Sequence, residues 1–149
     1  MSKNKKSNLI VSRERVKKYA EVFTPDFIVK QMCDLFPHEI WQNIDSTFLE
    51  PCCGKGAFVK EILARKLSIC NDIAQGKRAL RSIYCIDIQQ DNVDDTRTLM
   101  ANMFLDKFGT HDLIELNEIY AIIERNVICG DALVICKQLE TVEWDDLKI

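Results

Sequence analysis

The spacing of apolar positions predicts helices that alternate with short strands. Apolar side chains recur at helical spacing from Phe27 to Phe36, between the sequence Thr24-Pro25-Asp26 and Pro37. Threonine is a good N-cap, proline suits the first helical position, and an aspartate favours the positive end of the helix dipole. We therefore expect a helix to begin at Thr24, and a short second helix over residues 38–44.

Three apolar runs predict strands, at residues 47–49, 83–88 and 126–129. The second run is nearly all apolar, which is typical of a strand covered on both faces. Helices are expected over 57–67, over 91–124 with an interruption near Gly109, and from Ala132 on, whereas residues 68–81 look less regular. Strands that alternate with helices indicate parallel β-α-β units with right-handed crossovers. The predicted fold class is therefore α/β.

Composition narrows the class of protein. The chain has 149 residues, 47% of them hydrophobic and 29% charged, which suits one domain with a core of its own. No apolar run approaches the roughly 18 to 20 residues of a membrane span. The N-terminus lacks the apolar segment of a secretory signal, so we expect a cytoplasmic protein with no membrane contact.

The seven cysteines form no Cys-x-x-Cys pair, and most lie in apolar runs. We expect reduced cysteines that pack as small hydrophobic residues. Because the chain has only two histidines, and neither is near a cysteine pair, no metal site is expected.

Positive charge is concentrated at the N-terminus. Residues 1–18 carry a net charge of +6 and the rest of the chain −9. We therefore divide the chain into a flexible basic arm, 1–18, and a folded domain, 19–149. Such an arm can follow the phosphate backbone of DNA, although a solvated tail has the same composition. The basic residues of the arm are Lys3, Lys5, Lys6, Arg13, Arg15, Lys17 and Lys18.

An acidic residue stands at the end of each predicted strand: Glu50, Asp87 and Asp131. Ligands of open parallel sheets bind at the carboxyl ends of the strands, so these carboxylates are expected to meet in one crevice. A Gly54-x-Gly56 turn follows the first strand, but residue 59 is valine, so the dinucleotide-binding fingerprint is not met.

The chemistry of these acids favours one ligand. A carboxylate after the first strand repels phosphates and suits an ammonium group, and an acid in the second strand suits the two hydroxyls of a ribose. The third acid can accept a hydrogen bond from the exocyclic amine of a purine. S-adenosylmethionine carries an ammonium, a ribose and an adenine.

Four segments of the chain resemble successive motifs of the amino-methyltransferases of DNA found in restriction-modification systems and phages. These segments are Glu21-Val22-Phe23-Thr24-Pro25, residues 48–58 around Glu50-Pro51-Cys52-Cys53-Gly54, residues 84–88 around Asp87, and Gly130-Asp131-Ala132-Leu133. Their order resembles the gamma class, which mostly makes N6-methyladenine. The resemblance implies a Rossmann-like fold and an S-adenosylmethionine site over about residues 19–135.

The resemblance also implies a role for each matching residue. Thr24, between Phe23 and Pro25, would contact the methionine end of the cofactor, and Glu50 would lie near its ammonium. Cys52, Cys53, Gly54 and Gly56 would form a backbone cradle. Asp87 would bind the ribose hydroxyls, Ile88 would pack on the adenine, Asp131 would accept from its amine, and Ala132 would line the ring.

The family's catalytic Asn-Pro-Pro-Tyr motif has no counterpart, because the three prolines, at 25, 37 and 51, are not adjacent. No catalytic residue is therefore assigned, and we expect a partial domain of about three strands, truncated before that motif and inactive alone. The target-recognition region of the family is missing as well. The first strand would lie at a sheet edge, where the rest of a longer protein, a second chain or another copy should cover it.

Two other functions fit the same residues. One is a non-catalytic binding protein built on a methyltransferase remnant, such as a phage inhibitor or a regulatory subunit. The other is a methyltransferase that acts on RNA or on a protein glutamine, although the Phe-Thr-Pro motif ahead of the glycine motif favours DNA.

Overall fold

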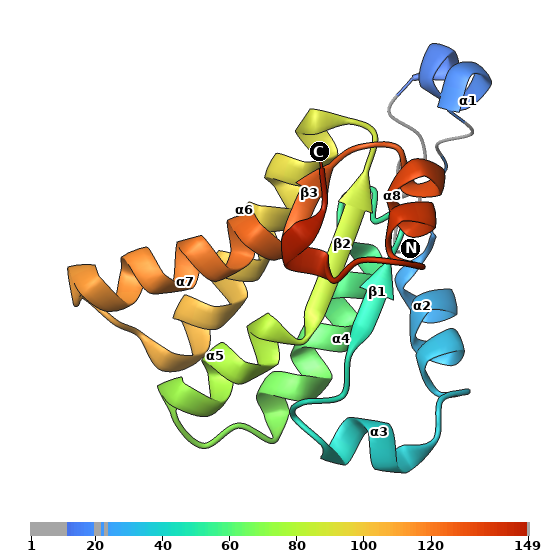
Figure 1. The fold of residues 1–149 in the computed structure, drawn as a ribbon. Helices are drawn as coiled ribbons and strands as arrows, with labels where there is room; N and C mark the ends of the chain where they lie inside the picture. Colours follow the sequence, from blue (N-terminus) through green and yellow to red (C-terminus); the bar gives the residue numbers. More distant parts are fainter. Residues whose placement is uncertain (1–11, 20–21, 23, 149) are drawn as a thin grey trace.

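The computed structural model of the chain describes residues 12–19, 22 and 24–148. These residues form a three-layered arrangement in which helices cover a small parallel sheet (Figure 1). The elements in chain order are α1 (Arg13–Tyr19), α2 (Asp26–Cys33), α3 (His38–Gln42), β1 (Phe48–Glu50), α4 (Ala57–Ser68), α5 (Ile73–Arg81), β2 (Ile83–Asp87), α6 (Gln90–Phe108), α7 (Leu113–Asn126), β3 (Val127–Cys129), α8 (Ala132–Gln138) and a short 3-10 helix, η1 (Trp144–Asp146).

The sheet confirms the predicted α/β class. Its order is β1-β2-β3, and both pairs are parallel, with Leu49 opposite Tyr84 and Ile86 opposite Ile128. Strand β2 is therefore central, and β1 lies at an edge of the sheet that the described residues form. Since all three strands run the same way, their carboxyl ends meet at one edge.

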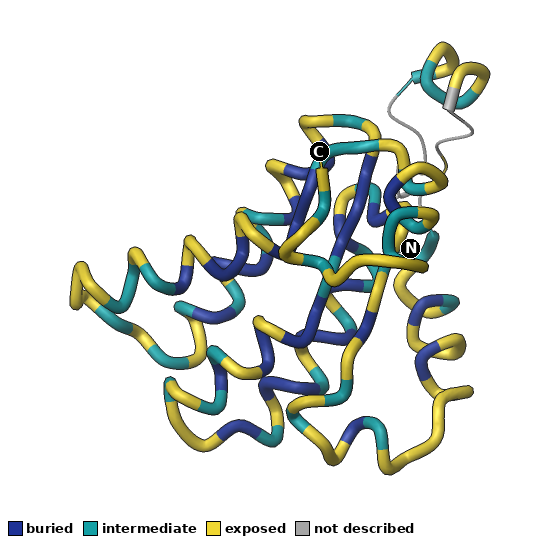
Figure 2. The backbone as a smooth tube through the Cα atoms, viewed as in Figure 1, coloured by how far each residue is buried: buried dark blue, intermediate teal, exposed yellow. Residues whose placement is uncertain are grey.

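One face of the sheet carries most of the core. Side chains of β1, β2 and β3 such as Phe48, Ile83 and Val127 pack in one cluster with α2 to α7. In Figure 2 this interior is dark blue, whereas the outer surfaces of α6 and α7 alternate between exposed and partly buried positions. The strands are thus held in place mainly from this side.

A smaller cluster covers the opposite face. It consists of Ile86, Ile128 and Ile135, with Trp144 and Leu147 packed against them. Figure 1 shows α8 and the C-terminal segment, both in red, in front of the sheet, while α4 lies behind it. Trp144 also contacts the ring of Tyr84, with 4.7 Å between ring centroids.

A buried lysine fixes the approach to β1. Lys66 of α4 is fully buried, and its Nζ donates to the carbonyl oxygens of Ile44 and Ser46 at 2.7 Å each. The same ammonium lies 5.2 Å from the ring centroid of Phe48. Burial lowers the pKa of Lys66 to about 8, although the charge of Asp45 acts in the opposite direction. Lys66 therefore ties α4 to the loop that leads into the first strand.

Two local predictions were wrong. Helix α2 begins at Asp26, and Pro25 is its N-cap, because the Pro25 carbonyl already accepts from the N–H groups of Ile28 and Val29. Thr24 therefore lies one residue too early to cap this helix.

The stretch expected to be irregular, 68–81, contains α5, which begins after Asp72. The Asp72 side chain accepts from the N–H of Gln75 at 2.8 Å and so caps the helix.

The N-terminal segment is described only from Ser12 on. Lys3, Lys5 and Lys6 lie outside the described residues, whereas Arg13 to Tyr19 form α1. Arg15 of α1 pairs with Asp91 at the start of α6, which lowers the pKa of the Asp91 carboxyl. This part of the predicted basic arm is thus helical and contacts the folded domain.

No described helix has the length and apolar character needed to cross a membrane. All seven cysteines are described and carry free thiols.

Candidate functional site

A pocket of about 530 Å³ lies at the carboxyl ends of the strands. It is formed mainly by the segment after β1, by the end of β2 with the first turn of α6, and by the segment after β3 with the first turns of α8. Its lining residues are Val22, Pro51, Cys52, Gly54, Asp87, Ile88, Gln89, Asn92, Gly130, Asp131, Ala132, Leu133 and Cys136.

Half of the predicted site residues line this pocket. They are Cys52, Gly54, Asp87, Ile88, Asp131 and Ala132. The predicted residues that are described but do not line the pocket are Thr24, Pro25, Glu50, Cys53 and Gly56. Phe23 lies outside the described residues. The ends of all three strands therefore contribute to one pocket. The roles predicted for the residues that do not line it stay predictions.

The glycine turn needs the backbone freedom of its glycines. Gly54 and Gly56 have φ angles of 51° and 80°, in the left-handed region that side chains disfavour. A Cβ at Gly56 would lie 2.9 Å from Cδ2 of Leu99 and 3.1 Å from Oγ1 of Thr96. Gly56 therefore lets the start of α4 approach α6 closely, which is a packing role, while Gly54 faces the pocket.

Asp87 holds this turn against the end of β2. Its Oδ2 accepts from the N–H of Gly54 at 2.8 Å, and its Oδ1 accepts from the N–H of Gln89 at 2.9 Å and from Nδ2 of Asn92 at 3.2 Å. The side chain is 8% exposed, so the carboxylate is nearly desolvated and well supplied with donors. Asp87 is thus a lining residue of the pocket whose orientation is fixed.

The backbone of the turn is fixed from two further sides. The N–H of Cys53 donates to the carbonyl of Ile86 at 2.9 Å, and Oγ1 of Thr96 donates to the carbonyl of Gly54 at 3.1 Å. The turn is therefore bonded to both β2 and α6. A turn held in this way presents its backbone to the pocket without having to reorganise on binding.

Glu50 does not line the pocket, but it directly precedes two residues that do, Pro51 and Cys52. Its Oε1 accepts from the N–H of Cys52 at 3.4 Å, a long hydrogen bond. Burial raises the pKa of the Glu50 carboxyl, the Cys52 N–H opposes this, and the nearby charge of Asp87 raises the pKa further. Burial is the main cause of a raised pKa of the Cys52 thiol, and the charges of Asp87 and Glu50 raise this pKa further. This side of the site therefore has a negative potential that favours a cationic ligand group.

Asp131 has a structural role as well as a place in the pocket. It is the N-cap of α8, and its Oδ1 accepts from the N–H of Leu133 at 2.8 Å. The residue is solvent-exposed. Because a carboxylate has about four acceptor sites, one capping bond leaves acceptor capacity for a ligand.

The rest of the pocket wall is apolar and open to solvent. Ile88 is 53% exposed and Leu133 is 83% exposed, and both line the pocket beside Ala132. Large apolar side chains exposed together in a concave site are typical of a surface that receives a flat, apolar ring.

Sequence reasoning missed seven lining residues. Five of them, Val22, Pro51, Gln89, Gly130 and Leu133, lie within two residues of positions that were predicted. Asn92 and Cys136 lie farther along the chain, each five residues after a strand-end acid. That spacing places each residue in the first two turns of the helix that follows its strand. A predicted helix directly after a strand-end acid was therefore the sequence signal that could have identified both residues.

No group of three or more His, Cys, Asp or Glu side chains that could hold a metal ion occurs among residues 12–19, 22 and 24–148.

Comparison with known proteins finds a partial similarity. A segment of 48 residues is 48% identical to an uncharacterized adenine-specific methylase of Mycoplasma pneumoniae (strain ATCC 29342 / M129 / Subtype 1). The matching segment covers 30% of this chain and 11% of that methylase, a small part of its length. No family model matches the chain, and no solved structure matches it. The chain is therefore related, over part of its length, to an adenine-specific methylase.

Proposed function

We propose that this chain is the S-adenosylmethionine-binding part of an adenine-specific DNA methyltransferase. One observation carries the proposal: the glycine turn, Asp87 and Asp131 meet in a single pocket at the carboxyl ends of three parallel strands. The partial similarity to an adenine-specific methylase supports it independently.

The residues present fit this cofactor. The Glu50 side of the site has the negative potential that an ammonium requires, and Asp87 offers a fixed, desolvated acceptor for a hydroxyl of the ribose. Ile88 and Leu133 form an apolar wall for the adenine, and Asp131 stands where it can accept from the adenine amine. When bound, S-adenosylmethionine supplies an electrophilic methyl group on its sulfonium.

This chain's own residues bind and orient the cofactor. No residue is assigned to hold the acceptor amine, since the sequence contains no Asn-Pro-Pro-Tyr motif. Transfer requires the amine to be aligned with the methyl group, so we propose that the chain alone binds the cofactor without methylating DNA. The acceptor-positioning group would come from a further polypeptide segment.

We also propose where that segment and the DNA bind. Strand β1 is an edge strand of the described sheet, and Leu49 at its centre is 44% exposed, so β1 is suited to pair with an added strand. Lys17 and Lys18 of α1 are exposed, on a helix that Arg15 ties to the start of α6, and we propose that they contact DNA phosphates. The proposed location is the cytoplasm, where free thiols persist.

Titration calorimetry with S-adenosylmethionine tests the cofactor proposal. We expect saturable binding by the wild-type chain, and a loss of roughly 1–3 kcal/mol, or roughly tenfold to a hundredfold in affinity, in Asp87→Ala. Asp106→Ala, which removes an exposed carboxylate from the same α6, is the matched control and should bind as the wild type does.

Circular dichroism establishes that each variant is folded before the titration. A folded wild-type chain that does not bind S-adenosylmethionine would contradict the proposal, and would favour a binding protein built on a methyltransferase remnant. Equal affinities of Asp87→Ala and the wild type would contradict the assigned site.

A further inference from the structure

Asn92 is a buried polar residue in the pocket that no motif of the sequence marks. It lies in the first turn of α6 and is 1% exposed, and its Nδ2 donates to Oδ1 of Asp87 at 3.2 Å. Burying an amide is costly unless its groups form hydrogen bonds, so an asparagine here requires a specific partner. That partner is Asp87, whose carboxylate lines the pocket, so the hydrogen bond bears on what the pocket can bind.

The three donors to Asp87 use most of its acceptor capacity. A carboxylate has about four acceptor sites, and Gly54, Gln89 and Asn92 occupy three of them. The Gly54 and Gln89 donors are backbone groups that the fold fixes, whereas the Asn92 donor is a side chain. Asn92 is thus the one of the three donors that a substitution can remove without altering the backbone.

We propose that Asn92 is a positioning residue that orients Asp87 to accept one ribose hydroxyl of an adenosine-containing cofactor. This inference rests on the proposed function and deepens it. Asn92 acts through Asp87: its amide holds Oδ1, so that the remaining acceptor direction of the carboxylate points into the pocket. Without that donor only the backbone N–H groups of Gly54 and Gln89 hold the carboxylate, so its orientation is less fixed and the preference of the pocket for a ligand with hydroxyls falls.

The decisive readout is the preference for ribose hydroxyls. Dissociation constants for adenosine and 2′,3′-dideoxyadenosine are measured by displacement of bound S-adenosylmethionine. For the wild type we expect adenosine to bind about tenfold more tightly, the effect of one hydrogen bond to a charged group. In Asn92→Leu, which has the same number of side-chain heavy atoms and the same branching but no donor, the ratio should fall to roughly twofold, with little change for the dideoxy compound.

Two further variants separate orientation from packing. Asn92→Asp keeps the size of the side chain but places a second carboxylate against Asp87, and it should also lose the preference. Thr96→Val removes the bond from Thr96 to the Gly54 carbonyl, one helical turn away, and should keep the wild-type ratio even if both ligands bind more weakly.

The outcomes distinguish this inference from the function on which it rests. Equal weakening of both ligands in Asn92→Leu, with the ratio unchanged, would overturn the positioning role and leave the cofactor site standing. Failure of adenosine to displace S-adenosylmethionine from the wild type would also overturn the positioning role. If the wild type does not bind S-adenosylmethionine at all, both proposals fail.

Discussion

Because of Lys66, the free energy of unfolding of the chain should depend on pH in the alkaline range. Its pKa falls from 10.5 to about 8 because burial disfavours the charged form. At about 1.4 kcal/mol per pKa unit, the charged lysine in the folded state carries a penalty on the order of 3 kcal/mol. The penalty applies wherever Lys66 remains charged in the folded protein.

The sign follows from proton counting. Below about pH 8 the lysine is protonated in both states, and the folded state bears the whole penalty. Between about pH 8 and 10.5 the unfolded chain holds a proton that the folded chain has released, so the free energy of unfolding rises with pH. The free energy of unfolding should therefore increase, through Lys66, by on the order of 3 kcal/mol across this window.

Urea unfolding of the wild type and of Lys66→Met at a series of pH values measures this term. The variant leaves the Ile44 and Ser46 carbonyls without their lysine donor at every pH, which shifts its stability by a constant amount. Burial raises the pKa of the Cys70 thiol and the charge of Lys66 acts in the opposite direction, so the same two proteins are also compared with Cys70→Ala in both, which removes this coupled titration. Lys60→Met, at an exposed position of the same helix, is the control for removing one lysine.

We expect the free energy of unfolding of the wild type to increase relative to that of Lys66→Met as the pH rises. A difference that stays constant within about half a kcal/mol between pH 7.5 and 10.5, or that shrinks, would refute the reasoning. Coincident m-values in the two proteins are required for the comparison.

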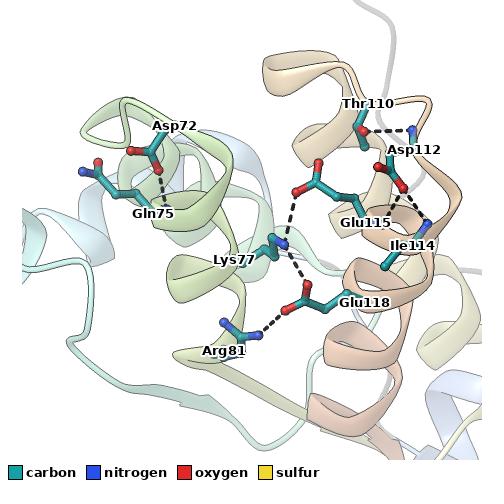
Figure 3. Close-up of polar contacts among 9 residues, drawn as sticks. All are labelled: Asp72, Gln75, Lys77, Arg81, Thr110, Asp112, Ile114, Glu115 and Glu118. Atoms are coloured by element: carbon teal, nitrogen blue, oxygen red, sulfur yellow. Dashed lines mark hydrogen bonds and ion pairs between the residues drawn. The ribbon is translucent and has the colours of Figure 1, made fainter.

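Three further predictions concern the turn, a helix junction and a cap. Gly56→Ala should destabilise the chain by about 1–3 kcal/mol in urea unfolding, because φ is 80° and the new Cβ would lie 2.9 Å from Leu99; an unchanged midpoint would contradict this packing. Lys77 bridges Glu115 and Glu118 across α5 and α7, and Arg81 also pairs with Glu118 (Figure 3). Hydrogen bonds from Lys77 and Arg81 lower the pKa of Glu118, so its stabilising contribution is present above the pKa of an unfolded glutamate and is lost as the pH falls. Lys77→Met should therefore reduce the loss of stability on acidification, and identical acid titration curves of thermal stability would exclude this role. Asp131→Ala should lose about 1 kcal/mol by removing the cap of α8 and should also weaken S-adenosylmethionine binding. Asp131→Ser should keep the cap but not the cofactor affinity, and full affinity in the serine variant would argue against a contact with the adenine.

The strands and most helices could be predicted because their sequence pattern is local. Strand β2 is an uninterrupted apolar run, and the acids at the strand ends predicted the site because parallel strands end at the same edge. Helix α5 was missed because Gly76 is a poor helix former. In the structure a Cβ at Gly76 would lie 2.5 Å from the Phe108 ring, so glycine is required there by contacts with a helix some thirty residues away.

The missed site residues have the same cause. Asn92 belongs to the site through its hydrogen bond to Asp87, which lies on a different element; its position five residues after that acid was the available signal, but the spacing does not show the hydrogen bond. The N-cap of α2 was misplaced by one residue because Thr24 and Pro25 both suit the start of a helix.

The small cluster on the second face of the sheet has a consequence for dynamics. Of the residues that the structure describes, three isoleucines, Ile86, Ile128 and Ile135, form the buried part of this cluster, whereas the opposite face carries the large core. Helix α8 with the segment to Leu147 is therefore expected to open as a separate cooperative unit, well below the free energy of global unfolding. Because Leu133 lies in α8 and Asp131 is its N-cap, one wall of the pocket would unfold and refold locally while the rest of the chain stays native. Amide hydrogen exchange would then show fast exchange in α8 and slow exchange in β2, and a ligand that bridges the two would slow the exchange of α8 alone.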